Sequence, residues 1–158
     1  MEKDKQRVKE LEAQVKTQKY RNFQEKVLLL KMLEKKIDSK VLTAFDEYIY
    51  ESSKKHWRNI AEQKGSNTIA DLLEVLWKPM ENEFQFSIEK KENGIQIYCT
   101  HCPLAEMAKE LGETEWGFKF YCMEDYGIVD GFNPKIGFKR TKTLMEGHVY
   151  CDHFYYMK

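Results

Sequence analysis

A cysteine that directly precedes a proline, Cys102 before Pro103, is the residue of this sequence best placed to act as a nucleophile. Proline favours the first position of a helix, so the pair predicts a short helix with Cys102 as its N-cap residue. The unpaired N–H groups and the dipole of a helix N-terminus favour an anion, which lowers the pKa of a thiol. A thiolate there can act as a catalytic nucleophile, although a small residue such as cysteine can also simply cap a helix.

A thiol and a carboxylate, Cys122 and Asp125, lie three residues apart in a segment with a helical pattern, so they share one helix face. Phe118 and Val129 extend this face, which places both polar groups between apolar neighbours. Burial raises the pKa of a carboxyl group and suits it to general acid or base catalysis. The alternative is that Asp125 lies at the wet edge of the helix while Cys122 fills the core.

A third group of reactive side chains includes Cys151 and His153, which alternate with Asp152 and so point to the same face of a predicted strand. Arg140 shares that face if the loop between the two strands has an even number of residues, and otherwise faces away. With the even count, a thiol, an imidazole and a guanidinium converge within one hairpin.

A zinc site is the competing explanation for the cysteines, because Cys99 and Cys102 have the spacing of half a zinc site. Against it, Cys99 falls on the hydrophobic side of its predicted strand, and no second pair of cysteines or histidines balances the first. A redox disulfide between the same two cysteines lacks the thioredoxin-like order of elements around it. We therefore expect no metal and no other cofactor.

These residues need elements that position them, and the first predicted element is a long helix over residues 2–37, which contain no Gly or Pro. Val8, Leu11 and Val15 form a thin apolar stripe near its start, with no obvious partner within the chain. We expect residues 1–38 to form this helix and to join two copies in a homodimer. Residues 39–158 would then form the catalytic or ligand-binding domain.

Two further helices are predicted before residue 80. One begins after Asp38-Ser39 and ends near Gly65, and the next is capped by Asn67 and stopped by Pro79. After Pro79 the hydrophobic period changes from that of a helix to that of a strand.

Asn93-Gly94 is the strongest hairpin signal in this second part of the chain. A turn at these two residues places Ile88 opposite Cys99 and Phe86 opposite His101.

Two helices should follow the first hairpin. Pro103 begins the first, which Gly112 closes, and Thr114 begins the second, which runs to about Asp130 with Gly131 as its stop. Residues 135–143 and 148–157 then read as a second hairpin. The expected fold class is α+β, with three N-terminal helices followed by two antiparallel β-hairpins that have two helices between them.

Composition limits the classes of partner. The chain has 158 residues, 42% of them hydrophobic, and a net charge of zero, which is typical of one globular protein with a sizeable core. Residues 1–40 carry an excess of positive charge, but acids dilute the basic residues, so we expect no nucleic-acid partner. No apolar run approaches the roughly 18 residues that span a bilayer, and no signal peptide is recognisable. We expect a cytoplasmic protein with no membrane partner.

Five short motifs in the C-terminal part of the sequence occur together in one order. They are Cys-Pro-Leu-Ala-Glu at 102–106, Cys-x-x-Asp at 122–125, Asn-Pro at 133–134, Arg-Thr-x-Thr at 140–143 and Gly-x-x-x-Cys-Asp at 147–152. With these motifs, residues 99–158 resemble the L-2-amino-thiazoline-4-carboxylic acid hydrolase family. The resemblance implies a hydrolase that opens the ring of a 2-amino-thiazoline carboxylate, a small cyclic amidine, to give a carbamoyl-cysteine. The expected enzyme class is a hydrolase of non-peptide C–N bonds.

The resemblance also assigns roles to residues within these motifs. Cys102 would be the nucleophile or orient the attacking water, Asp125 would act as acid and base, and Arg140 would clamp the substrate carboxylate through its planar fork. The expected catalytic residues are Cys102, Asp125 and Cys151, and the expected substrate-binding residues are Arg140, Thr141, His153 and Asn133. His148 stands where the family commonly carries an acid, so no role passes to that position.

Two other functions stay open. The terminal Gly-x-x-x-Cys-Asp-His-Phe segment is distantly similar to 4-vinyl reductase domains, so the protein could be a non-catalytic module that binds or senses a small molecule. The other alternative is a structural zinc-binding interaction module.

Overall fold

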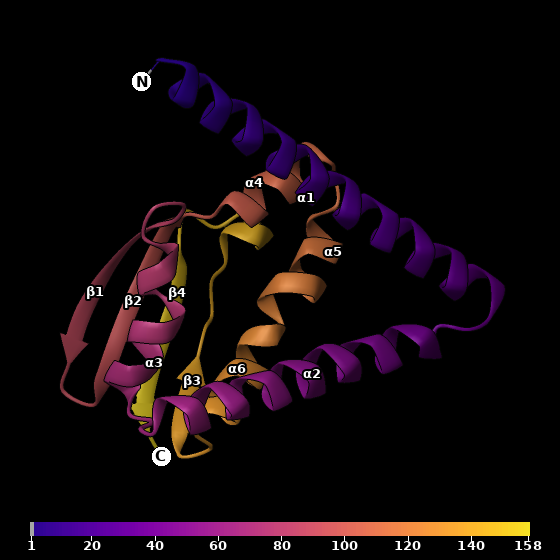
Figure 1. The fold of residues 1–158 in the computed structure, drawn as a ribbon. Coiled ribbons are helices and arrows are strands. Elements are labelled where there is room, and N and C mark those ends of the chain that lie inside the picture. The colour runs from indigo at the N-terminus through magenta and orange to yellow at the C-terminus, as the bar shows by residue number, and fades with distance from the viewer. Residues whose placement is uncertain (1) are drawn as a thin grey trace. The chain divides into compact units, whose positions relative to one another are not determined.

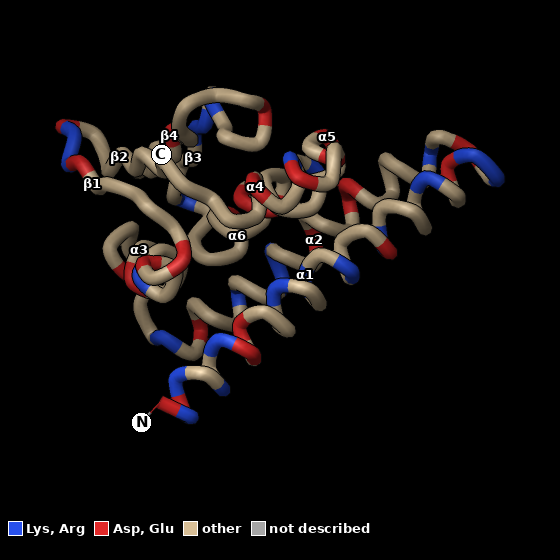
Figure 2. Tube along the Cα trace, turned by 90° about the horizontal axis from the view of Figure 1, so that it is seen from above, with Lys and Arg blue, Asp and Glu red and all other residues tan. Residues whose placement is uncertain are grey.

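The computed structural model describes residues 2–158, in two compact units that divide after Ala44. The first unit contains α1 (Glu2–Lys36) and the start of α2 (Lys40–Lys64). The second contains the rest of α2 and all later elements. Along α1, basic and acidic residues are interspersed rather than segregated (Figure 2), as their dilution in the sequence predicts. Within the described residues, no helix is both long enough and apolar enough to span a bilayer.

The apolar stripe near the start of α1 is exposed. Val8, Leu11 and Val15 are 52%, 47% and 54% exposed, which is high for aliphatic side chains on one helix face. We propose that this stripe pairs with a second copy of the chain, as the sequence predicts.

A chain that begins at Tyr20 should therefore be a monomer in solution and the full chain a dimer, as measured by light scattering at the same concentration. The full-length variant with Val8, Leu11 and Val15 all changed to Ser is the matched control, because it keeps the helix and loses only the stripe. Like the truncated chain, this variant should have the mass of a single chain in solution. The same number of chains per particle in all three proteins would contradict a dimer through α1.

The second unit is an α+β domain, with the predicted order of helices and hairpins (Figure 1). Its strands form one antiparallel sheet in the order β1-β2-β4-β3. Their bounds are β1 (Gln85–Lys91), β2 (Gly94–His101), β3 (Ile136–Lys139) and β4 (Cys151–Met157). The sheet confirms the predicted fold class and adds what the sequence did not show, namely that β4 of the second hairpin pairs with β2 of the first.

The first hairpin turns one residue earlier than predicted. Lys91 pairs with Gly94, so the turn is Glu92-Asn93, and Phe86 lies opposite Cys99 rather than opposite His101. Gly94 has no positive φ, and its role is spacing, since a Cβ there would collide with the carbonyl oxygen of Tyr155 on β4. The partners shift by two residues, so every side chain keeps its predicted face of the sheet.

The helix before the sheet begins at a different cap from the one predicted. In α3 (Ile69–Leu76) the N-cap is Thr68 rather than Asn67. The Asp71 N–H donates to the Thr68 hydroxyl at 3.2 Å, and the Thr68 N–H donates to the Asp71 carboxylate at 2.9 Å. This capping box outcompetes the single side chain of Asn67, which instead contacts Asn133. A 3-10 turn, η1 (Lys78–Met80), follows the helix.

The segment between the hairpins contains α4 (Pro103–Glu110), closed as predicted by Gly112 with φ +68°. The predicted second helix is instead three pieces: α5 (Thr114–Gly117), a π-helical turn η2 (Phe118–Cys122) and α6 (Glu124–Phe132). Gly131 does not stop α6. It lies inside the helix, at a position that must be a glycine because a Cβ there would collide with the backbone of Lys54 on α2.

The core of the domain lies against one face of the sheet. Ile97, Cys99, Cys151, His153 and Tyr155 project from β2 and β4 into it and are all buried. Trp77, at the C-terminal end of α3, donates from its indole N–H to the Tyr155 hydroxyl at 3.0 Å. Both α3 and α6 lie on this side of the sheet (Figures 1 and 2), so the core is also the place where the predicted reactive groups of α6 and β4 can meet.

Candidate active site

A narrow cavity of about 110 Å³ lies under the inner face of the sheet. It is lined by all four cysteines of the chain, together with Asp125, Arg140 and His153. The lining cysteines are Cys99, Cys102, Cys122 and Cys151. Three separate parts of the sequence, which supplied its three groups of candidate residues, therefore converge on one site.

Arg140, Asp125 and His153 form a connected chain in this cavity. The Arg140 side chain is only 2% exposed and makes an ion pair with Asp125, and its other terminal nitrogen donates to the Cys122 carbonyl at 3.0 Å. The same oxygen of Asp125, Oδ2, also lies 3.4 Å from Nε2 of His153. Arg140 thus holds Asp125 in place, and Asp125 in turn orients the imidazole.

One nitrogen of His153 is left without a partner. The residue is 7% exposed, and its Nδ1 is buried with no hydrogen-bond partner among the described residues. Asp125 beside Nε2 favours a proton on Nε2, which leaves the lone pair of Nδ1 free to accept one. A buried polar atom without a partner is costly, and a bound molecule or water in the cavity would satisfy it.

Cys151 is the thiol most strongly stabilised as a thiolate. The Cys99 thiol beside it is the main cause that lowers the pKa of Cys151, against an opposing effect of burial. The Leu144 N–H, which donates to the Cys151 sulfur at 3.1 Å, lowers this pKa further, as do His153 and Arg140. The same contact raises the pKa of Cys99, which is therefore the protonated member of the pair.

The helix-cap argument for Cys102 is only half right. Cys102 is the N-cap residue of α4, as predicted, but burial raises the pKa of its thiol. The N–H groups of Ala105 and Leu104 act in the opposite direction and do not outweigh burial. Burial likewise raises the pKa of Cys122. The helix start therefore does not lower the pKa of the Cys102 thiol as expected, because the sequence shows a helix start but not how deeply it is buried. The catalytic role of Cys102 stays a prediction.

Glu124 is a cavity residue that the sequence analysis missed. It lines the cavity beside Asp125, and burial, followed by the charge of Asp125, raises the pKa of its carboxyl group to about 7. Tyr121, Glu124, Asp125 and Ile128 all line the cavity at helical spacing. That spacing was the signal available in the sequence, since an acid at the centre of an inward-facing stripe is uncommon without a function.

The raised pKa of Glu124 predicts how stability depends on pH. The folded protein binds one more proton than the unfolded chain between pH of about 4.5 and about 7, so the free energy of unfolding should fall as the pH rises through this window. Urea unfolding at about pH 5 and about pH 8 would measure the fall. Glu124→Gln should reduce the difference, whereas Glu115→Gln, an exposed position, should not. Identical pH dependence in the wild type and Glu124→Gln would contradict the assignment.

Two of the expected substrate-binding residues lie elsewhere. Thr141 is exposed, and its hydroxyl and N–H both donate to Asp152, at 2.6 and 2.8 Å, on the other side of the sheet from His153. Asn133 donates from its side-chain amide to the Asn67 carbonyl at 2.8 Å and accepts from the Lys135 N–H. Both side chains tie loops together, and neither lines the cavity, so we do not retain them as binding residues.

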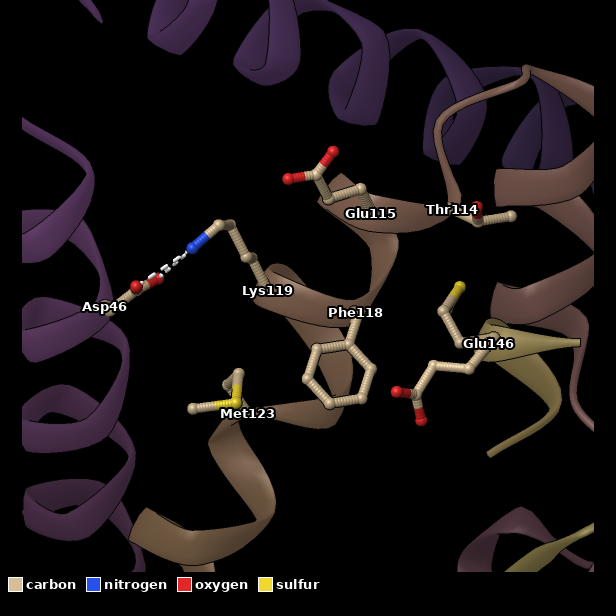
Figure 3. A pocket seen from close by; sticks show the side chains of 8 residues that line it. Asp46, Thr114, Glu115, Phe118, Lys119, Met123 and Glu146 are labelled. Atoms are coloured by element: carbon tan, nitrogen blue, oxygen red, sulfur yellow. Dashed lines mark hydrogen bonds and ion pairs between the residues drawn. The ribbon is translucent and has the colours of Figure 1, made fainter. Parts of the chain in front are cut away.

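A wider pocket of about 440 Å³ adjoins the cavity (Figure 3). Its side chains come from α2, α5 and the turns around them, and the Lys119 ammonium makes an ion pair with Asp46 at 2.9 Å across it. Met145 lines both the cavity and this wider, outer pocket. The ring of Phe118, which lines the outer pocket, lies 5.6 Å from the Arg140 guanidinium. Phe118 and Met145 therefore form part of the wall between the outer pocket and the cavity.

The zinc alternative finds no support in this geometry. Over residues 2–158, no three side chains of the His, Cys, Asp and Glu types are arranged so that they could hold a metal ion. The cysteines share a cavity, but they do not converge on a common point.

The fold and this cavity define an α+β protein with a small internal site in which thiols, carboxylates, an imidazole and a guanidinium meet. The chain belongs to the L-2-amino-thiazoline-4-carboxylic acid hydrolase family, whose model matches residues 10–155. The match reaches far beyond residues 99–158, the part that carries the recognisable motifs, and includes most of α1. No curated protein and no solved structure matches the chain.

Proposed function

We propose that the protein is a hydrolase that opens the ring of 2-amino-thiazoline-4-carboxylate or of a closely similar cyclic amidine that carries a carboxylate. The observation that supports this best is the chain from Arg140 through Asp125 to the unpartnered nitrogen of His153, beside the Cys151 thiolate. The family to which the chain belongs supplies the substrate class.

The first step would be attack by the Cys151 thiolate on the ring carbon that lies between nitrogen and sulfur. A bond forms between the Cys151 sulfur and this carbon, and the bond from the carbon to the ring sulfur breaks. The ring sulfur leaves with the electron pair and takes a proton. Glu124 is placed to supply it, because its raised pKa keeps it partly protonated near neutral pH.

The second step would release the product. Nδ1 of His153 takes one proton from water, the water oxygen bonds to the same carbon, and the bond to Cys151 breaks to return the thiolate. The remaining proton of the water moves from this oxygen to the former ring nitrogen as the carbonyl forms. The imidazolium then returns its proton through solvent to Glu124, which gave one to the ring sulfur in the first step. Asp125 stabilises the imidazolium that forms, as the carboxylate does in catalytic triads. Both carbon–nitrogen bonds survive, and the product is a carbamoyl-cysteine with a free thiol. In this route the reaction breaks a C–S bond of the ring, whereas the enzyme class expected from the resemblance is cleavage of a C–N bond.

Arg140 has N–H groups beyond the two that bind Asp125 and Cys122, and these could also hold the substrate carboxylate. The guanidinium would then serve both the substrate and the acid that orients His153.

Turnover of L-2-amino-thiazoline-4-carboxylate tests the proposal. The product should appear as a new free thiol by titration and as a mass increase of one water. Cys151→Ser should abolish product formation, whereas Cys122→Ser, a change at another cavity thiol whose pKa is raised, should cost much less. A thermal shift on adding the compound, with no product from the wild type, would instead support a binding or sensing module.

A further inference from the structure

Two cysteines lie side by side on the two central strands of the sheet. Cys99 on β2 is directly opposite Cys151 on β4, and both side chains lie on the inner face. Residues opposite each other in antiparallel strands have Cα atoms about 4.5–5.5 Å apart, which falls within the range that disulfides span. Both cysteines are free thiols in the structure.

We propose that Cys99 and Cys151 are a modification site, at which a hydroperoxide converts the two thiols into a reversible disulfide inside the cavity. This proposal goes beyond ring opening and stands without it, because it rests on the sheet register and on the environment of the two sulfurs.

The two thiols differ in the way that this chemistry requires. Cys151 has its pKa lowered by Cys99, by the Leu144 N–H and by the nearby positive groups, so it supplies the thiolate that attacks peroxide. Contact with Cys151, followed by burial, raises the pKa of Cys99, which keeps this second thiol protonated and unreactive until Cys151 has reacted. Once the Cys151 charge is consumed, the main cause that holds Cys99 protonated disappears.

The electrons and atoms balance over two steps. First, the Cys151 thiolate attacks one oxygen of the hydroperoxide, the O–O bond breaks, and an alcohol or water leaves with a proton, which gives a sulfenic acid. Second, the Cys99 sulfur loses its proton and attacks the Cys151 sulfur, the S–O bond breaks, and water leaves. The peroxide gains two electrons and the two cysteines lose them. A small dithiol reverses the change.

The other cysteines of the cavity are poorer participants. Burial raises the pKa of both Cys102 and Cys122, so neither supplies a thiolate as readily. Neither lies opposite Cys151 in the sheet, where β2 contributes Cys99 alone to the pair. The modification should therefore be selective, and oxidation would remove the thiolate to which we assign catalysis.

Treatment of the full chain with hydrogen peroxide tests the proposal. Free thiols, titrated after denaturation, should fall from four to two per chain, and dithiothreitol should restore them. Mass analysis of a digest without reduction should show the peptide that contains Cys99 linked to the one that contains Cys151. Both readouts are independent of turnover, so failure of the hydrolase proposal leaves this result unaffected, and the reverse also holds.

Two variants sharpen the test. Cys122→Ser should still form the linked peptide, whereas Cys99→Ser should form none and should carry Cys151 onward to sulfinic acid, which dithiothreitol does not reverse. Circular dichroism establishes that each variant is folded. Cys99 and Cys102 fall in one tryptic peptide, so fragment spectra of the linked wild-type peptides decide which of the two is joined to Cys151. Linkage through Cys102 or Cys122, linkage only between chains, or no loss of thiols at a peroxide dose that oxidises free cysteine would overturn the proposal.

Discussion

His153→Gln should lower kcat for ring opening by about 10²–10⁴-fold, the usual contribution of a general base. The side chain keeps its approximate size and a polar end near Asp125, so the fold should survive, but the nitrogen that accepts a proton from water is lost. Because the first step does not need this base, the Cys151 adduct should accumulate. Intact mass measurement after mixing with substrate would show it as an increase equal to the whole substrate, because ring opening releases no fragment before the second step.

His148→Gln is the matched control, because it makes the same exchange at an exposed histidine in the loop before β4. Its kcat should stay within about two-fold of the wild type, as expected for a surface change away from the site. Equal losses of kcat in the two variants, or normal turnover by His153→Gln, would remove His153 from the mechanism.

Arg140→Met should lower the free energy of unfolding by about 3–5 kcal/mol, because it leaves the Asp125 carboxylate without its partner in the cavity. The Arg140 side chain is 2% exposed and that of Asp125 is 19% exposed, so water replaces little of the lost interaction. Urea unfolding would measure the change. Arg58→Met on the exposed face of α2 should change stability by less than about 0.5 kcal/mol.

Two more variants separate charge from geometry at this position. Arg140→Lys keeps the charge but not the planar fork, so it should recover part of the stability while substrate binding stays clearly weaker than in the wild type. The double change of Arg140→Met with Asp125→Leu should be more stable than Arg140→Met alone, because no unpaired buried charge remains. A double variant no better than the single one would mean that the pair contributes through packing rather than charge.

The sequence predicted the elements well because their signals are local. The helix that begins at Pro103 and ends at Gly112, the change of period after Pro79 and the two hairpins all depend on neighbouring residues. The errors occurred where a distant contact decided the outcome. Gly94 was predicted as a turn residue, but a glycine is needed there because the backbone of Tyr155 approaches closely. Gly131 was predicted as a helix stop, but a glycine is needed there because the backbone of Lys54 packs against it.

The sequence predicted which residues line the candidate site better than it predicted what each of them does. The sequence placed Arg140 on the same face as Cys151 and His153 only if the loop between the strands has an even number of residues. The structure places all three residues on one cavity. Which thiol is activated depends on burial and on the Leu144 N–H, and neither can be read from spacing. Glu124 was overlooked because its neighbour Asp125 carries the recognisable motif.

The position of β4 has a consequence for how the protein is made. This strand follows every other element in chain order, yet it lies between β2 and β3 in the sheet. Until it emerges from the ribosome, β2 has one unpaired edge whose inner face carries Ile97 and Cys99. An open edge of this kind is a template for pairing with other chains, so the nascent protein is most prone to aggregate just before synthesis of β4. Insertion of that strand closes the edge and delivers Cys151 and His153 in the same event, so a chain that has not finished folding has no assembled site.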